Sequence, residues 1–155
     1  MTNVNLKGAV VPSGEGKKFN VLGHAITSPI TAQTTGGKYY VFEMLTPPGF
    51  GVPPHVHERE DELIYIVAGE FEIILEDEKF SAHTGDHVFF PRHVAHAFQN
   101  VGSKPGKAIF TISPGANFEE FFEEMCVLPA GEPDLQKVTE IFAKYGMEVL
   151  IPSMA

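Results

Sequence analysis

The sequence predicts an all-β domain followed by two C-terminal helices, and three patterns support this fold class. Turn signals recur along the chain, which has 15 glycines and 12 prolines among 155 residues. Short runs rich in β-branched and aromatic residues lie between these signals, and after Pro114 the apolar spacing changes to that of helices. Many short strands separated by evenly spaced turns are typical of a β-sandwich or β-barrel.

The expected strands are the apolar runs between turn signals. They lie at residues 38–45, 63–67, 71–75, 87–90 and 108–112. We expect one domain over residues 1–155, because the chain is too short for two ordinary domains. Its barrel core covers about residues 20–114, and a helical tail covers about residues 115–155.

The first helix is predicted from an apolar stripe at i, i+3, i+4 and i+7, formed by Phe118, Phe121, Phe122 and Met125. Asn117 stands where an N-cap residue would. A second helix is predicted over residues 133–145, with a proline at its first position and a glycine after its end. The two stripes fit either a partner-binding surface or packing on the barrel exterior, and we favour packing.

Charge and composition exclude several classes of protein. The formal net charge is −9, and no basic run is present, so we expect no nucleic-acid partner. No window approaches the roughly 18 consecutive apolar residues of a membrane span, and the first residues lack a signal-peptide pattern. The one cysteine, Cys126, cannot form an internal disulfide. We therefore expect a cytoplasmic protein that contacts no membrane.

Three histidines and one glutamate form a candidate metal site. In a strand, His55 and His57 project to the same face. Glu62 opens an apolar run, where a carboxylate is costly unless a cation compensates for its desolvation. His96 follows later, after Pro91. The H-x-H spacing with a following glutamate fits surface histidines as well as a metal site, and the motifs below favour the metal.

The chain resembles the cupin family in two motifs. The first motif, G-x5-H-x-H-x3,4-E-x6-G, is matched at every fixed position by Gly49, His55, His57, Glu62 and Gly69. The second, G-x5-P-x-G-x2-H-x3-N, is matched by Gly85, Pro91, His96 and Asn100. His93 stands where this motif has a glycine. The resemblance implies a small antiparallel jelly-roll barrel with the metal inside it.

The resemblance extends to single-domain cupins related to quercetin 2,3-dioxygenase. It implies His55, His57, Glu62 and His96 as ligands of one divalent transition metal, with Fe, Mn, Ni, Co, Cu and Zn all compatible. It also implies oxygenation by O2 of an enolic or phenolic, flavonol-like small molecule, with Glu62 as both ligand and catalytic base. Two alternatives remain: an isomerase or lyase acting on a sugar or keto acid, and a non-enzymatic binding module.

Other residues carry weaker expectations. The substrate pocket is predicted from residues that share a face with the ligands or with each other: Tyr40, Phe42, Met44, Ile64, Ile66 and Phe98. We interpret His93 as a loop or surface residue, and His24, His83 and His87 as structural or solvated. Because sheet edges are usually covered, we expect a homodimer in which residues 4–11 pair with the partner's sheet.

Overall fold

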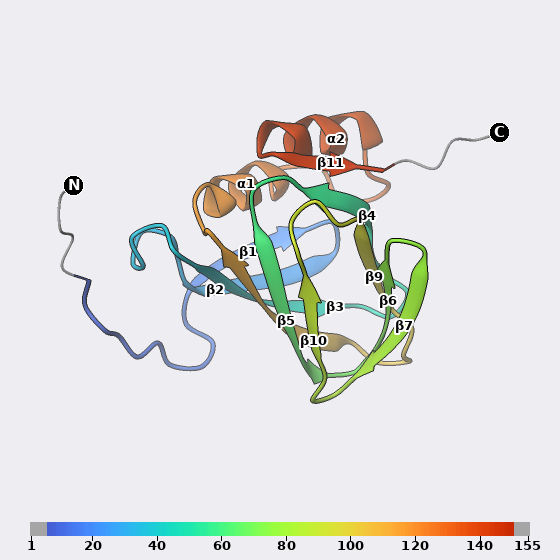
Figure 1. Cartoon of the computed structure of the whole chain (residues 1–155), viewed down its shortest axis with the longest axis horizontal. Helices are drawn as coiled ribbons and strands as arrows, with labels where there is room; N and C mark the ends of the chain where they lie inside the picture. The colour runs from blue at the N-terminus through green and yellow to red at the C-terminus, as the bar shows by residue number, and fades with distance from the viewer. Residues whose placement is uncertain (1–5, 151–155) are drawn as a thin grey trace.

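The computed structural model describes residues 6–150, and antiparallel strands are their main secondary structure (Figure 1). Within these residues, the strands are β1 Lys17–Val21, β2 His24–Ile30, β3 Tyr40–Thr46, β4 Gly51–His57, β5 Asp61–Ala68, β6 Glu70–Leu75, β7 Glu78–His83, β8 His87–Phe90, β9 His96–Asn100, β10 Gly106–Ser113 and β11 Met147–Val149. The helices are α1 Phe118–Met125 and α2 Leu135–Lys144.

The strands form two sheets that enclose the core. The six-stranded sheet has the order β1-β2-β3-β10-β5-β8, and the five-stranded sheet has the order β11-β4-β9-β6-β7. All pairings are antiparallel, and long crossovers bring β3 next to β10 and β4 next to β9. The predicted all-β jelly-roll class is therefore confirmed.

Along the core strands, the burial of the side chains alternates with the two-residue period of a strand. In β3 and β10 every second side chain is buried, and their inward residues pair across the sheet in register. Phe42 on β3 stacks on Phe110 of β10, with ring centroids 4.7 Å apart. On the cavity side, Phe122 of α1 meets Phe42 edge-on at 4.9 Å. Aromatic contacts therefore join the sheet to the helices, as offset and edge-to-face geometries favour.

Both predicted helices are present at one end of the barrel (Figure 1). Asn117 holds the predicted N-cap position of α1, but its backbone is left-handed and its side chain makes no capping hydrogen bond. The second helix begins later than residue 133, because Asp134 is its N-cap and accepts hydrogen bonds from the backbone amides of Gln136 and Lys137. Neither described helix is long and apolar enough to cross a membrane.

The N-terminal segment predicted to pair with a partner lies partly outside the described residues. Its described part, residues 6–11, is exposed and belongs to no strand. Figure 1 shows this segment extending away from the barrel.

Candidate metal centre

The four predicted ligand residues meet inside the barrel, although they come from three strands. His55 and His57 lie on β4, and His96 lies opposite His55 on the neighbouring strand β9. Glu62 reaches them from β5, in the other sheet. Each residue is buried, and one nitrogen or oxygen atom from each lies within 4.8 Å of the others. The structure therefore brings together the four residues that the sequence predicts.

The three imidazoles are held by their Nδ1 atoms. Each Nδ1 lies near an oxygen that can only accept a hydrogen bond, so we assign the proton to Nδ1. The pairs are His55 with the Pro53 carbonyl at 2.8 Å, His57 with the Glu60 carboxylate at 3.2 Å, and His96 with the Val94 carbonyl at 3.1 Å. A neutral imidazole with Nδ1 protonated has its lone pair on Nε2. This is the arrangement of metal-ligating histidines.

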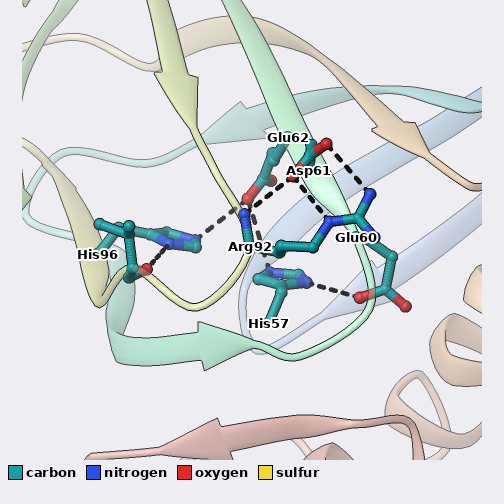
Figure 2. Close-up of polar contacts among 7 residues, drawn as sticks. His57, Glu60, Asp61, Glu62, Arg92 and His96 are labelled. Carbon is teal, nitrogen blue, oxygen red and sulfur yellow. Dashed lines mark hydrogen bonds and ion pairs between the residues drawn. The ribbon is translucent and has the colours of Figure 1, made fainter.

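Glu62 faces two of these Nε2 atoms (Figure 2). Its Oε2 lies 3.1 Å from Nε2 of His96 and 3.6 Å from Nε2 of His57. The His96 Nε2 is buried and makes no hydrogen bond. With Nδ1 protonated, the short contact places a lone pair against a carboxylate oxygen, which is unfavourable unless a cation lies between them. The cluster therefore fits a divalent cation on the geometry of its own atoms.

The protonation states of His55 and Glu62 suit metal binding. Burial, with the nearby His96 and His57, lowers the pKa of His55 to about 3, so this imidazole stays neutral. Burial lowers the pKa of His57, but the hydrogen bond to Glu60 and the charges of Glu62 and Glu60 raise it by more. Burial raises the pKa of Glu62, yet the surrounding histidines outweigh that effect and lower it. Glu62 is therefore a carboxylate, the form that a metal requires.

Glu60 is a functional candidate that the sequence did not reveal. Its carboxylate is buried and accepts the hydrogen bond from His57 (Figure 2). In the sequence, Glu60 is one charged residue in the charged run 58–61, and such a run indicates only a solvated turn. In the structure, its neighbours Glu58 and Arg59 are indeed exposed, whereas Glu60 is buried. A glutamate three residues after a ligand histidine, and two before the ligand glutamate, is the one signal that points to it.

An ion pair fixes the loop that precedes His96. The Arg92 side chain donates hydrogen bonds to both Asp61 oxygens at 3.1 Å, and its backbone amide donates to Asp61 at 2.9 Å (Figure 2). Asp61 directly precedes Glu62, so the contact ties the β8–β9 loop to the start of β5. Both side chains are partly exposed, so the contribution to stability is about 1 kcal/mol or less.

A cavity of about 80 Å³ adjoins the cluster. Among the predicted pocket residues, Phe42, Met44 and Phe98 line it. Tyr40, Ile64 and Ile66 do not, which corrects that part of the prediction. Two physical reasons account for the difference.

The first reason concerns β5. Phe110 lies on β10 between β3 and β5, and it lines the cavity, whereas its β5 neighbour Ile64 packs in the core beyond it. Ile66 is one step further along the same strand. The second reason concerns Tyr40, whose fully buried hydroxyl donates a hydrogen bond to Ser28 at 2.7 Å.

The helices contribute a cavity wall that the sequence did not predict. The lining residues from α1 and α2 are Phe118, Phe121, Phe122, Met125, Val138 and Phe142. Two of these rings cover the cluster itself. Phe142 meets His55 edge-on at 5.7 Å, and Phe118 lies parallel to His57 at 6.2 Å between ring centroids. The helices therefore pack against the barrel and also form one wall of its internal cavity.

The remaining histidines lie away from the cluster. His24 is buried and lines the cavity, but both ring nitrogens are engaged, with Thr46 Oγ1 at 3.0 Å and the Gly51 carbonyl at 3.2 Å. His83 and His87 are exposed. His93 is exposed too, and its φ of 69° is the left-handed conformation that a glycine adopts readily. Its backbone amide donates to the His57 carbonyl at 2.8 Å.

Comparison with known proteins shows which family and which proteins this chain is similar to. Residues 42–113 match the family described as "Cupin domain". Over 90 residues the chain is 31% identical to Protein SchB of Streptomyces halstedii, covering 58% of this chain and 64% of that protein. Over 87 residues it is 25% identical to quercetin 2,3-dioxygenase of Bacillus subtilis, covering 56% of this chain and 26% of that protein. The chain therefore spans less than two thirds of either relative.

A solved structure agrees with the sequence comparisons. The structure of KdgF from Halomonas sp. superposes with a TM-score of 0.62 at 26% identity, covering 70% of this chain and 94% of that one. The matched segment of the family contains His55, His57, Glu62 and His96. Residues 42–113 thus match the cupin domain family, and the two sheets and the buried ligand cluster give this chain the cupin fold.

Proposed function

We propose that this protein is a metal-dependent dioxygenase acting on a small apolar molecule that carries an enolic or phenolic hydroxyl. The observation that carries the proposal is the position of the ligand cluster. His55, His57, Glu62 and His96 all line the same cavity, and the rest of that lining is largely apolar. A substrate in this cavity would have its hydroxyl beside the cluster and its carbon frame against aromatic rings.

The cluster would hold one divalent transition metal through three imidazole nitrogens and the Glu62 carboxylate. Nitrogen and carboxylate donors suit several first-row metals. When bound, such an ion supplies Lewis acidity at the substrate oxygen. The protein's own part is to keep the three Nε2 lone pairs aimed at one point, which the Nδ1 hydrogen bonds achieve.

Glu62 has a second role in this proposal. Its Oε2 faces His96 and His57, which leaves Oε1 to accept the proton of the substrate hydroxyl. The lowered pKa keeps Glu62 a carboxylate, so that Oε1 is an acceptor. The aromatic walls exclude water, which strengthens the electrostatic contacts around the resulting oxyanion. The ionised substrate is then electron-rich enough to react with O2.

The cavity wall argues against phosphosugars and other strongly anionic substrates. In the part of the chain that the structure describes, no lysine or arginine lines the cavity. The relative from Bacillus subtilis is named quercetin 2,3-dioxygenase, which supports an oxygenase. The cavity volume of about 80 Å³ is below the roughly 150 Å³ that holds benzene in an engineered core. Even a one-ring substrate therefore requires the wall to move outward, and a flavonol requires a larger movement.

The test is O2 uptake by protein reconstituted separately with each candidate metal, across phenolic and enolic substrates from one ring to flavonol size. We expect uptake with wild type, and a loss of about 100- to 10,000-fold for metal-loaded Glu62→Gln, the range typical of losing a general base. Glu58→Gln is the matched control, because Glu58 is exposed and lies in the same segment. It should leave the rate unchanged.

The outcomes separate the three function classes. Near wild-type turnover by metal-loaded Glu62→Gln removes Glu62 from the proton transfer. Absence of O2 uptake with every metal and substrate excludes the dioxygenase. Turnover of a sugar or keto acid without O2 then assigns the isomerase or lyase class, and binding without turnover assigns a binding module.

A further inference from the structure

Among the described residues, the exposed part of the cavity lining is confined to one edge, between the β1–β2 turn and the first half of β4. The lining residues that are not buried are Leu22, Gly51, Val52 and Pro53. Val52 lies opposite Phe98 of β9, which also lines the cavity, so the Val52 side chain points inward. The β1–β2 turn belongs to the six-stranded sheet and β4 to the five-stranded sheet. The cavity therefore has an entrance between the two sheets, at Leu22 and Val52.

Leu22 has a backbone conformation that leucine rarely adopts. Leu22 and Gly23 form the two-residue turn between β1 and β2, with φ values of 49° and 87°. Positive φ at both residues is the pattern of a type I′ turn, whose first central position usually holds asparagine, aspartate or glycine. A bulky side chain at positive φ is strained, and strain of this kind clusters at functional sites. Here the strained residue lines the cavity and packs against the core, so its side chain has a task at the entrance.

The β1–β2 turn is the part of the entrance that can move outward. It ends an edge strand, since β1 pairs with β2 alone. The Phe50 ring rests on Gly23, so closely that a Cβ atom there would lie 2.5 Å from the ring. Phe50 is itself 46% exposed and does not line the cavity. Beyond the turn, His24 donates a hydrogen bond to the Gly51 carbonyl at 3.2 Å, which fixes the start of β2. Movement is therefore confined to the turn, and it breaks only the contact with an exposed ring.

The chemistry of the entrance indicates which molecules pass through it. Leu22, Gly51, Val52 and Pro53 have neither charged nor polar side chains. A phenolate would lose its hydration shell there without gaining a hydrogen-bond donor, which is costly. A neutral phenol or enol passes at a lower cost. The entrance therefore favours the protonated form of the substrate class proposed above, and Glu62 takes the proton only after the molecule has entered.

We propose that small uncharged molecules reach the metal centre between the β1–β2 turn and β4, and that Leu22 selects them by size through the rate at which they enter. The cavity of about 80 Å³ is too small for one ring unless its wall moves, and outward movement of the turn opens it at the entrance. Larger molecules need a wider opening, so Leu22 hinders them more. The proposal rests on the proposed function for the class of molecule that enters, but its test needs no turnover.

The test is stopped-flow fluorescence of two probes of different size, 1-naphthol and 3-hydroxyflavone. Zinc-loaded protein is used because zinc has no redox chemistry, and metal-free protein forms a second series. Leu22→Asn shortens the side chain, and asparagine tolerates positive φ better than leucine, so this variant should fold. We expect its association rate constant for 3-hydroxyflavone to rise about 10-fold, within the range over which association rates vary among variants of one site. The rise for 1-naphthol should be smaller, and Leu22→Phe should slow both probes.

Two further measurements separate an entrance residue from one that only contacts the bound probe. Opening an entrance speeds entry and exit together, so the dissociation rate should rise as well, and the dissociation constant should change less than either rate. Loss of a contact changes mainly the dissociation rate. Leu128→Ala is the matched control, because Leu128 is also half-buried against the core but does not line the cavity. Phe50→Ala releases the turn and should raise both rates, whereas Phe80→Ala, which alters an equally exposed ring on β7, should not.

The outcomes distinguish this proposal from the proposed function. An unchanged association rate in Leu22→Asn overturns the entrance, and so does an equal rise in Leu128→Ala, which would indicate a general loosening of the fold. Failure of both probes to bind wild type in either series also overturns it. Faster entry in Leu22→Asn, together with no O2 uptake by wild type, supports the entrance and excludes only the dioxygenase. O2 uptake by wild type with an unchanged rate in Leu22→Asn excludes only the entrance.

Discussion

Two parts of the cavity lining, which we call the strand wall and the helix wall, are built by opposite means. The strand wall, on β4, β5 and β9, presents polar atoms whose positions are fixed by hydrogen bonds to Nδ1 of each histidine. The helix wall, on α1 and α2, presents only apolar side chains, which pack without directional contacts. We infer from this difference that metal affinity depends on the strand wall, whereas the size and shape of the substrate that can bind depend on the helix wall. The predictions below test this difference, from the largest expected effect to the smallest.

The largest expected effect is on the strand wall. His96→Ala removes one of four ligands, so we expect metal content after dialysis to fall to near zero. The chain should remain folded, because barrel packing does not depend on this imidazole. Elemental analysis and circular dichroism measure the two properties. Unchanged metal content would show that His96 is not a ligand.

The matching change on the helix wall is Phe122→Ala. This buried ring packs on Phe42, Phe118 and Phe19, so its loss should lower the free energy of unfolding by about 3–5 kcal/mol. Metal content should not change, and larger substrates should bind. Denaturant unfolding and elemental analysis test this, with exposed Phe80→Ala as the control. Loss of metal in Phe122→Ala would contradict a division between the walls.

A smaller effect on the strand wall is expected from Glu60, which we regard as a positioning residue. Glu60→Ala removes the acceptor that orients His57, and such changes typically weaken metal affinity by about 10- to 100-fold. Glu60→Gln keeps an acceptor oxygen and should restore most of the affinity. Competition with a chelator measures both variants, with exposed Glu58→Ala as the control. Equal metal affinity in Glu60→Ala and wild type would show that Glu60 does not position His57 for metal binding.

The smallest effect concerns the backbone of the β8–β9 loop, which leads into the strand wall. His93 has a φ of 69°, a conformation that costs about 1–2 kcal/mol for residues with a Cβ. His93→Gly relieves this strain but adds freedom to the unfolded chain, so we expect a net gain of about 0.5–1 kcal/mol. Thermal unfolding measures it. His83→Gly, in strand β7, should lose stability instead, and a loss in His93→Gly would show that its side chain stabilises the loop.

The clustering of the four candidate ligands could be predicted because its signal lies in short motifs. His55 and His57 share a face by strand period alone, and the motif spacing places Glu62 and His96 with them. Glu60 could not be predicted from the same stretch. Its neighbours are charged and exposed, and only the path of the turn between β4 and β5 buries its side chain beside His57.

The cavity was harder to predict because its walls are non-local. Strand alternation correctly indicated that Tyr40, Ile64 and Ile66 are buried, but not which side of Phe110 they occupy. Strands β1, β2, β7 and β11 lie outside the expected strands, and β2 contains Pro29, a residue type that is rare within a sheet interior. The structure accommodates it where the pairing with β3 shifts register, between Thr27 and Ile30.

Glu62 is the one ligand candidate on the six-stranded sheet, while the three histidines belong to the five-stranded sheet. An ion held by all four would therefore bind the two sheets to each other directly, in addition to the packing and polar contacts between them. Such an ion, bound to the native chain alone, adds about 4 kcal/mol at a free concentration 1,000 times its dissociation constant. Opening of the barrel between its sheets would then respond to the metal supply around the protein, so resistance to proteolysis would report metal occupancy.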